Sequence, residues 1–188
     1  MKRIGILGSI GSGKSYVARS FGYPVFNADK EVSKLYKNDR KVFYKLKKVL
    51  PKYFNKFPVK KHEILSAILG KKNNLKNIVK IVHLEIRKKM NIFLKHNKNK
   101  KIVILDIPLL LENKINQKDD ILIFVQSEKS KIQKKLKKRK NFNPKLFNIF
   151  KNIQLPLDYK RKRSHFIIKN DFTKRTVLKY VKNILKQL

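Results

Sequence analysis

The chain has 188 residues, of which 41% are hydrophobic, so it is long enough for one packed domain and is not disordered throughout. It has no cysteine, which excludes disulfides and thiolate metal sites. No run approaches the roughly 18 apolar residues of a membrane span, and the first apolar run is too short for a signal peptide. We therefore expect a cytoplasmic protein without a membrane partner.

The charge is unusual, because 49 lysines and arginines against 12 acidic residues give a formal net charge of +37. Such a balance is typical of nucleic-acid binding, and it also suits polyanionic small substrates. The basic residues are mostly lysine and are spread over almost the whole chain, a pattern that drift toward A- and T-rich codons also produces. We favour drift and expect no specific nucleic acid as a partner.

The first motif is G-x-x-x-x-G-K-[ST] at Gly8–Ser15, between an apolar run at 4–7 and a potential helix start at 16–21. Its glycines let backbone N–H groups converge on phosphate oxygens, and the helix dipole favours the negative charge. Lys14 can reach the β- and γ-phosphates, and the Ser15 hydroxyl can bind Mg²⁺. The alternative is a chance glycine-rich turn. The context favours binding of a nucleoside triphosphate.

Residues 24–29 predict a short buried strand that ends in Asp29. In open parallel sheets, ligands bind beyond the carboxyl ends of the strands, so this carboxylate is expected beside the phosphate loop. An equally good interpretation from these residues alone is that Asp29 caps a helix that begins at Lys30.

Helical spacing of apolar residues continues along the middle of the chain. It predicts two helical pieces in 30–50 with a turn at 38–39, a loop at 51–58, a helix from Lys61 to about Gly70, and a long helix at 75–95. His83 lies on the polar side of the long helix, where a lone histidine is more often structural than catalytic.

Two further strands come next in the chain. The run 102–105 reads as a buried parallel strand that ends in Asp106, which is the form of a Walker-B element whose carboxylate supports Mg²⁺. Residues 121–125 read as another central strand.

The C-terminal third begins with a predicted basic helix at 128–140. Residues 141–163 are less regular and contain the cations of 160–163. These form either a solvated surface or a mobile lid that closes over the triphosphate, and phosphoryl transfer favours the lid. A last strand at 165–168 and an amphipathic helix at 173–188 complete the prediction.

Six motifs, in order, resemble the dephospho-CoA kinase family across essentially the full length. The start Ile6–Ser15 is similar to L-T-G-G-I-G-S-G-K-S, with Ser9 in place of a glycine. The others are Asn27–Asp29 (family D-A-D), Asp106–Glu112 (D-x-P-L-L-x-E), a segment from Gln133 to Arg139 that ends in arginine as in the family, Gln154–Lys160 (Q-x-P-x-x-x-K) and Ile168–Phe172 (I-x-N-x-G), which keeps Asn170.

Several positions depart from the family pattern. Leu84 stands where the family has proline, Ser164–His165 replaces Ala-Asp, and Phe172 replaces a late glycine. Lysine stands for arginine at Lys61 and Lys135, which keeps the charge but loses bidentate geometry.

The resemblance implies a P-loop kinase fold: α/β, with a five-stranded parallel sheet flanked by helices, a helical substrate-binding part and a lid. Its single domain would divide into a core (about 1–55, 100–137 and 164–188), a substrate-binding part (about 56–99) and a lid (about 138–163). It also implies transfer of the γ-phosphoryl group of ATP, with Mg²⁺, to the ribose 3′-hydroxyl of dephospho-CoA.

The resemblance also implies roles for individual residues. Asp29 would be the base or orienter of the acceptor hydroxyl, with Lys14 and Arg139 supplying charge. ATP would contact Gly8, Gly11, Ser12, Gly13, Lys14, Ser15, Tyr16 and Asn170. The acceptor would meet Lys61, His83, Arg87, Pro108 and Leu109, and the metal would be held by Ser15 and Asp106. The alternatives are another small-molecule P-loop kinase and a basic nucleic-acid-binding ATPase.

Overall fold

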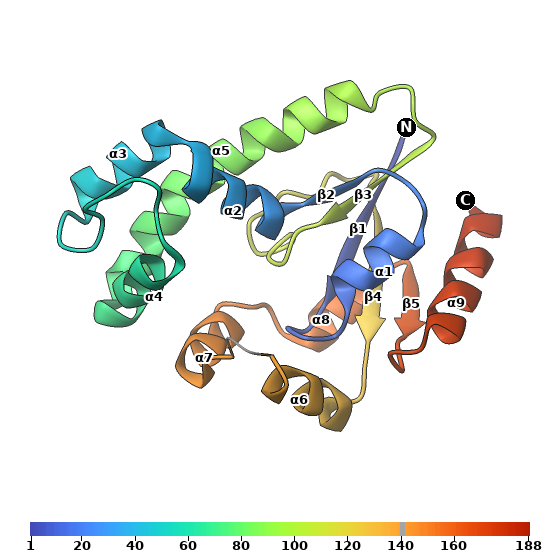
Figure 1. The fold of residues 1–188 in the computed structure, drawn as a ribbon. Helices are drawn as coiled ribbons and strands as arrows, with labels where there is room; N and C mark the ends of the chain where they lie inside the picture. Colours follow the sequence, from blue (N-terminus) through green and yellow to red (C-terminus); the bar gives the residue numbers. More distant parts are fainter. Residues whose placement is uncertain (140–141) are drawn as a thin grey trace.

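A five-stranded, all-parallel sheet forms the centre of the computed structural model, which describes residues 1–139 and 142–188 (Figure 1). The strands run in the order β2-β3-β1-β4-β5. The elements, in chain order, are β1 (Lys2–Gly8), α1 (Lys14–Ser20), β2 (Val25–Asn27), α2 (Ala28–Asn38), α3 (Arg40–Val49), α4 (Lys61–Gly70), α5 (Lys72–His96), β3 (Ile102–Asp106), β4 (Ile121–Gln126), α6 (Lys129–Lys137), α7 (Pro144–Asn152), α8 (Leu157–Lys162), β5 (Phe166–Lys169) and α9 (Lys174–Gln187).

Alternation along the strands divides the core between the two faces of the sheet. In β4, Ile123 and Val125 pack with α1 and α9, whereas Leu122 and Phe124 pack with α2–α5 on the other face. Both faces of a central parallel strand are therefore covered, which is why these strands read as unbroken apolar runs in the sequence. The five-stranded parallel α/β fold predicted from the sequence is confirmed.

The long helix α5 organises the helices on the second face, because α2, α3 and α4 all contact it. Its apolar stripe includes Ile78, Val82, Ile86 and Met90, all buried. These positions recur every four residues and lie on one side of the helix. Part of this stripe forms one wall of the cavity at the carboxyl edge of the sheet.

Most predicted elements are present, with three differences. The strand predicted at 24–29 is β2 and ends at Asn27, so Asp29 lies in the first turn of α2. The basic helix expected at 128–140 is α6 and ends at Lys137. The less regular stretch contains two helices, α7 and α8, because Asn143 caps α7 with Pro144 in its first turn, and Pro156 is the N-cap of α8.

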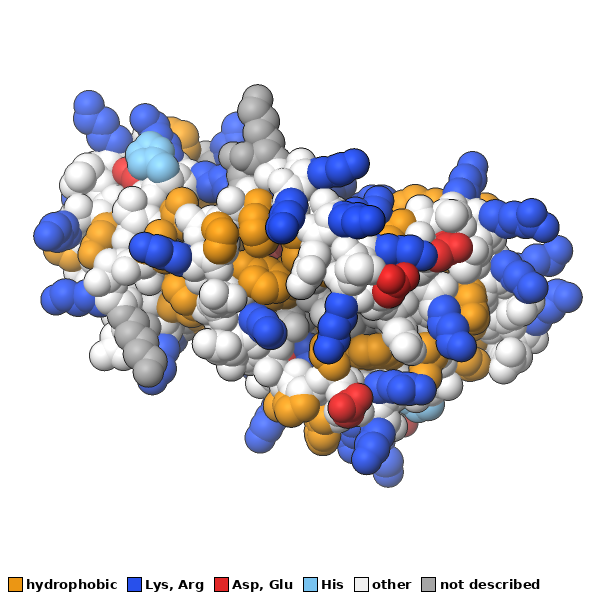
Figure 2. Space-filling view, turned by 90° about the horizontal axis from the view of Figure 1, so that it is seen from below, with side chains coloured by type: hydrophobic (Ala, Val, Ile, Leu, Met, Phe, Trp, Pro, Cys, Tyr) orange, Lys and Arg blue, Asp and Glu red, His pale blue; other side chains and the backbone are white. Residues whose placement is uncertain are grey.

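The face of the molecule that Figure 2 shows is basic without one dominant patch. Figure 2 shows lysine and arginine side chains scattered over the whole of one face, with hydrophobic side chains gathered between them and few acidic ones. Within 1–139 and 142–188, no helix is both long enough and apolar enough to cross a membrane.

Candidate active site

A cavity of about 670 Å³ opens at the carboxyl edge of the sheet. The phosphate loop, the start of α2 and the end of β3 line one part of it, and α4 and α5 line the other. The carboxyl ends of neighbouring parallel strands meet at this edge, so residues distant in the sequence converge there. Of the predicted site residues, those that line the cavity are Gly11, Gly13, Lys14, Ser15, Tyr16, Asp29, His83, Arg87, Asp106, Pro108, Leu109 and Arg139.

The phosphate loop requires glycine at two positions in particular. Gly11 has φ 85°, and a Cβ there would lie 3.0 Å from Ile132 and 3.1 Å from Leu136, two buried residues of α6. Gly13 has φ 91°, and a Cβ there would lie 2.3 Å from the amide nitrogen of Asn170. Only glycine adopts these angles without strain and admits such close neighbours. The loop is therefore held between α6 and the end of β5.

The Lys14 ammonium lies over the loop and donates to two of its carbonyls, Gly8 O at 3.2 Å and Ser9 O at 2.7 Å. Burial lowers the pKa of Lys14 to about 8. The carboxylates of Asp106 and Asp29 oppose this shift, and the cations Lys160 and Arg139 add to it. Lys14 is thus a cation at neutral pH that loses its proton in the mildly alkaline range.

Asp29 lies in the first turn of α2 and lines the cavity. It is not the cap of that helix, because Asn27 is the N-cap and its side chain accepts from Lys30 N at 2.8 Å. The capping interpretation of Asp29 is therefore wrong. Partial burial raises the pKa of Asp29, and the nearby Asp106 carboxylate raises it further, against Lys14 and Arg139. A carboxylate with a raised pKa is a stronger base than an ordinary one.

Asp106 ends β3 beside Asn27, its register partner on β2. The Asn27 amide donates to the Asp106 carboxylate, which fixes the orientation of that side chain. Asp106 and Ser15 both line the cavity and supply a carboxylate and a hydroxyl. Oxygen donors of this kind are what Mg²⁺ prefers, with phosphate oxygens and water completing its shell. The residues present fit the predicted metal.

Of the cations predicted for the lid, Arg139 and Lys160 have different surroundings. Arg139 follows α6, is exposed, and lines the cavity near Lys14 and Asp29. Lys160 is only 1% exposed and forms an ion pair with Glu112 at 2.5 Å. Lys160 is therefore not a solvated surface cation. Residues 140 and 141 of the predicted lid lie outside the described residues, and the lid itself stays a prediction.

The other part of the cavity is mainly apolar. One face of α5 supplies Leu75, Ile78, Val79, Val82 and Ile86, and α4 supplies Ile64 and Ile68. His83 and Arg87, one helical turn apart, border this stripe and bring polar groups to it. Burial lowers the pKa of His83, and the Arg87 cation lowers it further, so the imidazole is neutral at pH 7.

Comparisons with known proteins give the family. The dephospho-CoA kinase family model matches residues 2–175. The chain belongs to the dephospho-CoA kinase family. Two dephospho-CoA kinases are each 32% identical to it. The match to the protein from Wolbachia of Brugia malayi covers 98% of this chain and 97% of that protein. The match to the protein from Bartonella henselae covers 99% of this chain and 100% of that protein. The family makes the chain an ATP-dependent kinase.

Two solved structures have the same fold as this chain. The crystal structure of TT1252 from Thermus thermophilus has a TM-score of 0.77 at 24% identity, covering 100% of this chain and 97% of that one. Dephospho-CoA kinase from Campylobacter jejuni has a TM-score of 0.66 at 21% identity, with the same coverage. The P-loop kinase architecture is shared over the whole length.

Four residues that are predicted to contact ATP or the acceptor do not line the cavity: Gly8, Ser12, Lys61 and Asn170. Lys61 begins α4 and shares a helical face with Ile64 and Ile68, one turn beyond the lining. Gly8 and Ser12 belong to the phosphate loop and are buried. Whether these residues contact a substrate stays a prediction.

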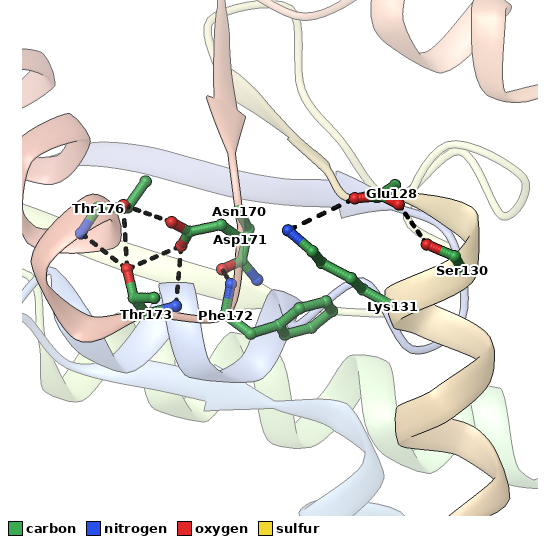
Figure 3. Close-up of polar contacts among 8 residues, drawn as sticks. All are labelled: Glu128, Ser130, Lys131, Asn170, Asp171, Phe172, Thr173 and Thr176. Atoms are coloured by element: carbon green, nitrogen blue, oxygen red, sulfur yellow. Dashed lines mark hydrogen bonds and ion pairs between the residues drawn. The ribbon is translucent and has the colours of Figure 1, made fainter.

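Asn170 holds the phosphate loop in place by a hydrogen bond to its backbone. Its side-chain amide donates to Ser12 O at 2.8 Å, and the same carbonyl accepts from the Ser127 hydroxyl at 3.0 Å. Its side-chain oxygen accepts from Phe172 N at 2.9 Å (Figure 3). The adjoining turn is closed by Asp171, whose carboxylate accepts from Thr173 and Thr176. The sequence pointed to Asn170 through the I-x-N motif, but gave no indication of Ser127.

Removing the Asn170 amide should destabilise the protein. Asn170→Ala leaves the buried Ser12 carbonyl with one donor fewer, so we expect a loss of roughly 1–3 kcal/mol in the free energy of unfolding, measured by urea denaturation. ATP affinity should fall as well, because the loop loses a support. The matched control is Asn183→Ala on the exposed side of α9, which should change stability by less than about 0.5 kcal/mol. Equal midpoints for the two variants would contradict the supporting role.

Sequence reasoning missed several lining residues, among them Tyr36, Asn113, Phe150 and Gln154. Tyr36 reads in the sequence as one more apolar helix position. Burial raises the pKa of its phenol, which stays protonated and brings a hydroxyl to the α2 side of the cavity. Gln154 stands in a family motif that carried no assigned role. Its place in the cavity depends on contacts between distant parts of the chain.

Proposed function

We propose that this protein transfers the γ-phosphoryl group of ATP to the ribose 3′-hydroxyl of dephospho-CoA, giving CoA and ADP. The observation that carries the proposal is that one cavity joins the phosphate loop, Asp29 and a largely apolar chamber between α4 and α5. The loop suits the triphosphate, and the chamber with His83 and Arg87 at its border suits a large acceptor with both apolar and phosphate parts.

The chemistry is determined by the positions of the charged groups. The loop N–H groups and Lys14 hold the β- and γ-phosphates, for which the Lys14 ammonium exchanges its two carbonyl partners for phosphate oxygens. Asp29 accepts the proton of the 3′-hydroxyl. The hydroxyl oxygen bonds to the γ-phosphorus as the bond between that phosphorus and the ADP oxygen breaks. Arg139 stabilises negative charge on the transferring group. In this proposal the two sites hold donor and acceptor in line, which is most of what this reaction requires.

Ser15 and Asp106 are the residues that would hold Mg²⁺. When bound, the ion neutralises part of the phosphate charge. Asp106 is fixed for this purpose by the Asn27 amide, and its negative charge also offsets that of Lys14 in the free protein.

The substrate assignment is tested by turnover. Purified protein with ATP and Mg²⁺ should convert dephospho-CoA to CoA with release of one ADP for each CoA, followed by chromatography of both products. A nucleoside monophosphate offered in its place should give no ADP above the rate without acceptor. Turnover of the monophosphate without turnover of dephospho-CoA would overturn the proposal in favour of another small-molecule kinase.

A further inference from the structure

Glu112 makes two buried contacts with a distant part of the chain. It lies in the turn after β3, and its side chain is 9% exposed. Its Oε1 atom accepts from Leu155 N at 3.0 Å and pairs with the Lys160 ammonium at 2.5 Å. Leu155 lies between α7 and α8, and Lys160 lies in α8. One carboxylate oxygen therefore holds the connection between these helices.

Stability alone does not explain this pair. Two buried charges lose their hydration, and a pair of apolar side chains of similar size often stabilises a protein as well or better. The second oxygen, Oε2, is buried and has no hydrogen-bond partner among the described residues. Since the pair is costly in this way, its effect on the position of neighbouring residues explains it better than a contribution to stability.

The residues next to the Glu112 contacts in the sequence line the cavity. Asn113 follows Glu112 directly and Gln154 precedes Leu155 directly, and both line the cavity. The Asn113 carbonyl also accepts from the Arg87 guanidinium at 2.9 Å. The Glu112 contacts thus connect the α5 wall of the cavity, through the turn after β3, to the α7–α8 connection.

Helix α7 strengthens this connection. It contacts α4, and Phe150 from α7 lines the cavity with Ile64 and Ile68 of α4. Two further apolar residues of α7, Leu146 and Ile149, pack on the edge of the same core. The end of α7 is held on one side by α4 and on the other by Glu112, which leaves Gln154 between two fixed points.

We propose that Glu112 is a positioning residue: through Leu155 N and Lys160 it holds Gln154 and Asn113 at the acceptor side of the cavity. The proposal rests on the proposed function in so far as the acceptor is dephospho-CoA. It unites two separate sequence motifs, P-L-L-x-E and Q-x-P-x-x-x-K, in one contact. Gln154 and Asn113 then contact the acceptor, and Glu112 acts only through them.

Two double variants separate positioning from stability. In Glu112→Leu with Lys160→Met, both charges and the acceptor for Leu155 N are gone. We expect a folded protein whose KM for dephospho-CoA rises about tenfold, the worth of one positioned hydrogen bond, while KM for ATP changes less than about twofold. In Glu112→Gln with Lys160→Met, the amide oxygen still accepts from Leu155 N, so most of the acceptor KM should return.

The matched control is a second buried ion pair, Arg3–Asp120. Asp120 likewise accepts from a cation, Arg3 at 2.9 Å, and from a backbone N–H, Gln117 at 2.9 Å, but at the amino edge of the sheet. Asp120→Leu with Arg3→Met should alter the melting temperature and leave both KM values unchanged. If the first Glu112 variant also keeps a wild-type acceptor KM, the pair is only structural and the proposal is overturned.

A second measurement does not depend on the substrate. Amide hydrogen exchange at 153–155 should become faster in the Glu112→Leu, Lys160→Met protein and stay near wild type in the Glu112→Gln, Lys160→Met protein. Unchanged exchange in the first would overturn the anchor itself. Absence of CoA formation by the wild-type protein would instead overturn the proposed function, and the exchange result would still decide whether Glu112 holds this connection.

Discussion

Asp29→Asn should lower kcat roughly 100- to 10,000-fold, the usual contribution of a positioned general base. ATP affinity should be retained or slightly increased, because the substitution removes a negative charge near the bound phosphates. The variant keeps the shape of the side chain and loses its negative charge together with the ability to take a proton. Titration of ATP and steady-state rates with dephospho-CoA measure the two quantities separately.

The pH dependence of the wild-type rate should reflect the same residue. Partial burial and the Asp106 carboxylate raise the pKa of Asp29, so its protonated form, which cannot act as a base, is present at higher pH than for an ordinary aspartate. The rate should therefore fall as the pH decreases through this raised pKa. The remaining activity of Asp29→Asn should lack this acid limb.

Glu31→Gln is the matched control for Asp29→Asn. It removes the same charge from the same first turn of α2, but Glu31 pairs with Lys34 at 2.6 Å and does not line the main cavity. Its kcat should stay within about twofold of wild type, since an exposed pair of this kind contributes little. Equal effects of the two substitutions would mean that net charge, rather than a base, controls the rate.

The parts of the fold that the sequence predicted are those encoded locally. The phosphate loop, the buried strands predicted at 102–105 and 121–125, and the long helix all depend on motifs or periodicity within a few residues. The edge strand β2 is predicted with less accuracy, because the sequence indicates a strand that ends in Asp29 and leaves open whether Asp29 caps the next helix, whereas Asn27 both ends the strand and caps α2. Asp29 still reaches the predicted edge, since the first turn of α2 lies directly beyond β2.

The parts that the sequence did not predict depend on contacts between distant residues. Lys160 was grouped with three neighbouring cations, and nothing near it in the sequence indicates that it is buried against Glu112. Glu112 and Leu155 are 43 positions apart, and no periodicity links them. The apolar chamber likewise arises only when α4 and α5 face each other. Motif resemblance named these residues without giving their physical role.

The charge of Lys14 should control nucleotide binding at alkaline pH. Burial lowers the pKa of Lys14 to about 8 in the free protein. Bound phosphates favour the protonated form, so its pKa rises on binding and a proton is taken up above pH 8. ATP affinity should therefore decrease about 30-fold between pH 7 and pH 9.5, where the free protein has lost most of this proton.

Two substitutions distinguish Lys14 from the many other lysines. Lys14→Ala should bind ATP weakly at every pH and lose the alkaline decrease, because no ammonium remains to titrate. Lys14→Arg keeps its charge throughout this range, so its affinity should also be independent of pH between 7 and 9.5, at a level set by how well the larger guanidinium fits the loop. An alkaline decrease that persists in Lys14→Arg would assign the titration to another group. A flat profile in both variants, beside a sloping wild type, would establish that the Lys14 ammonium, among 49 lysines and arginines, carries the alkaline pH dependence of nucleotide binding.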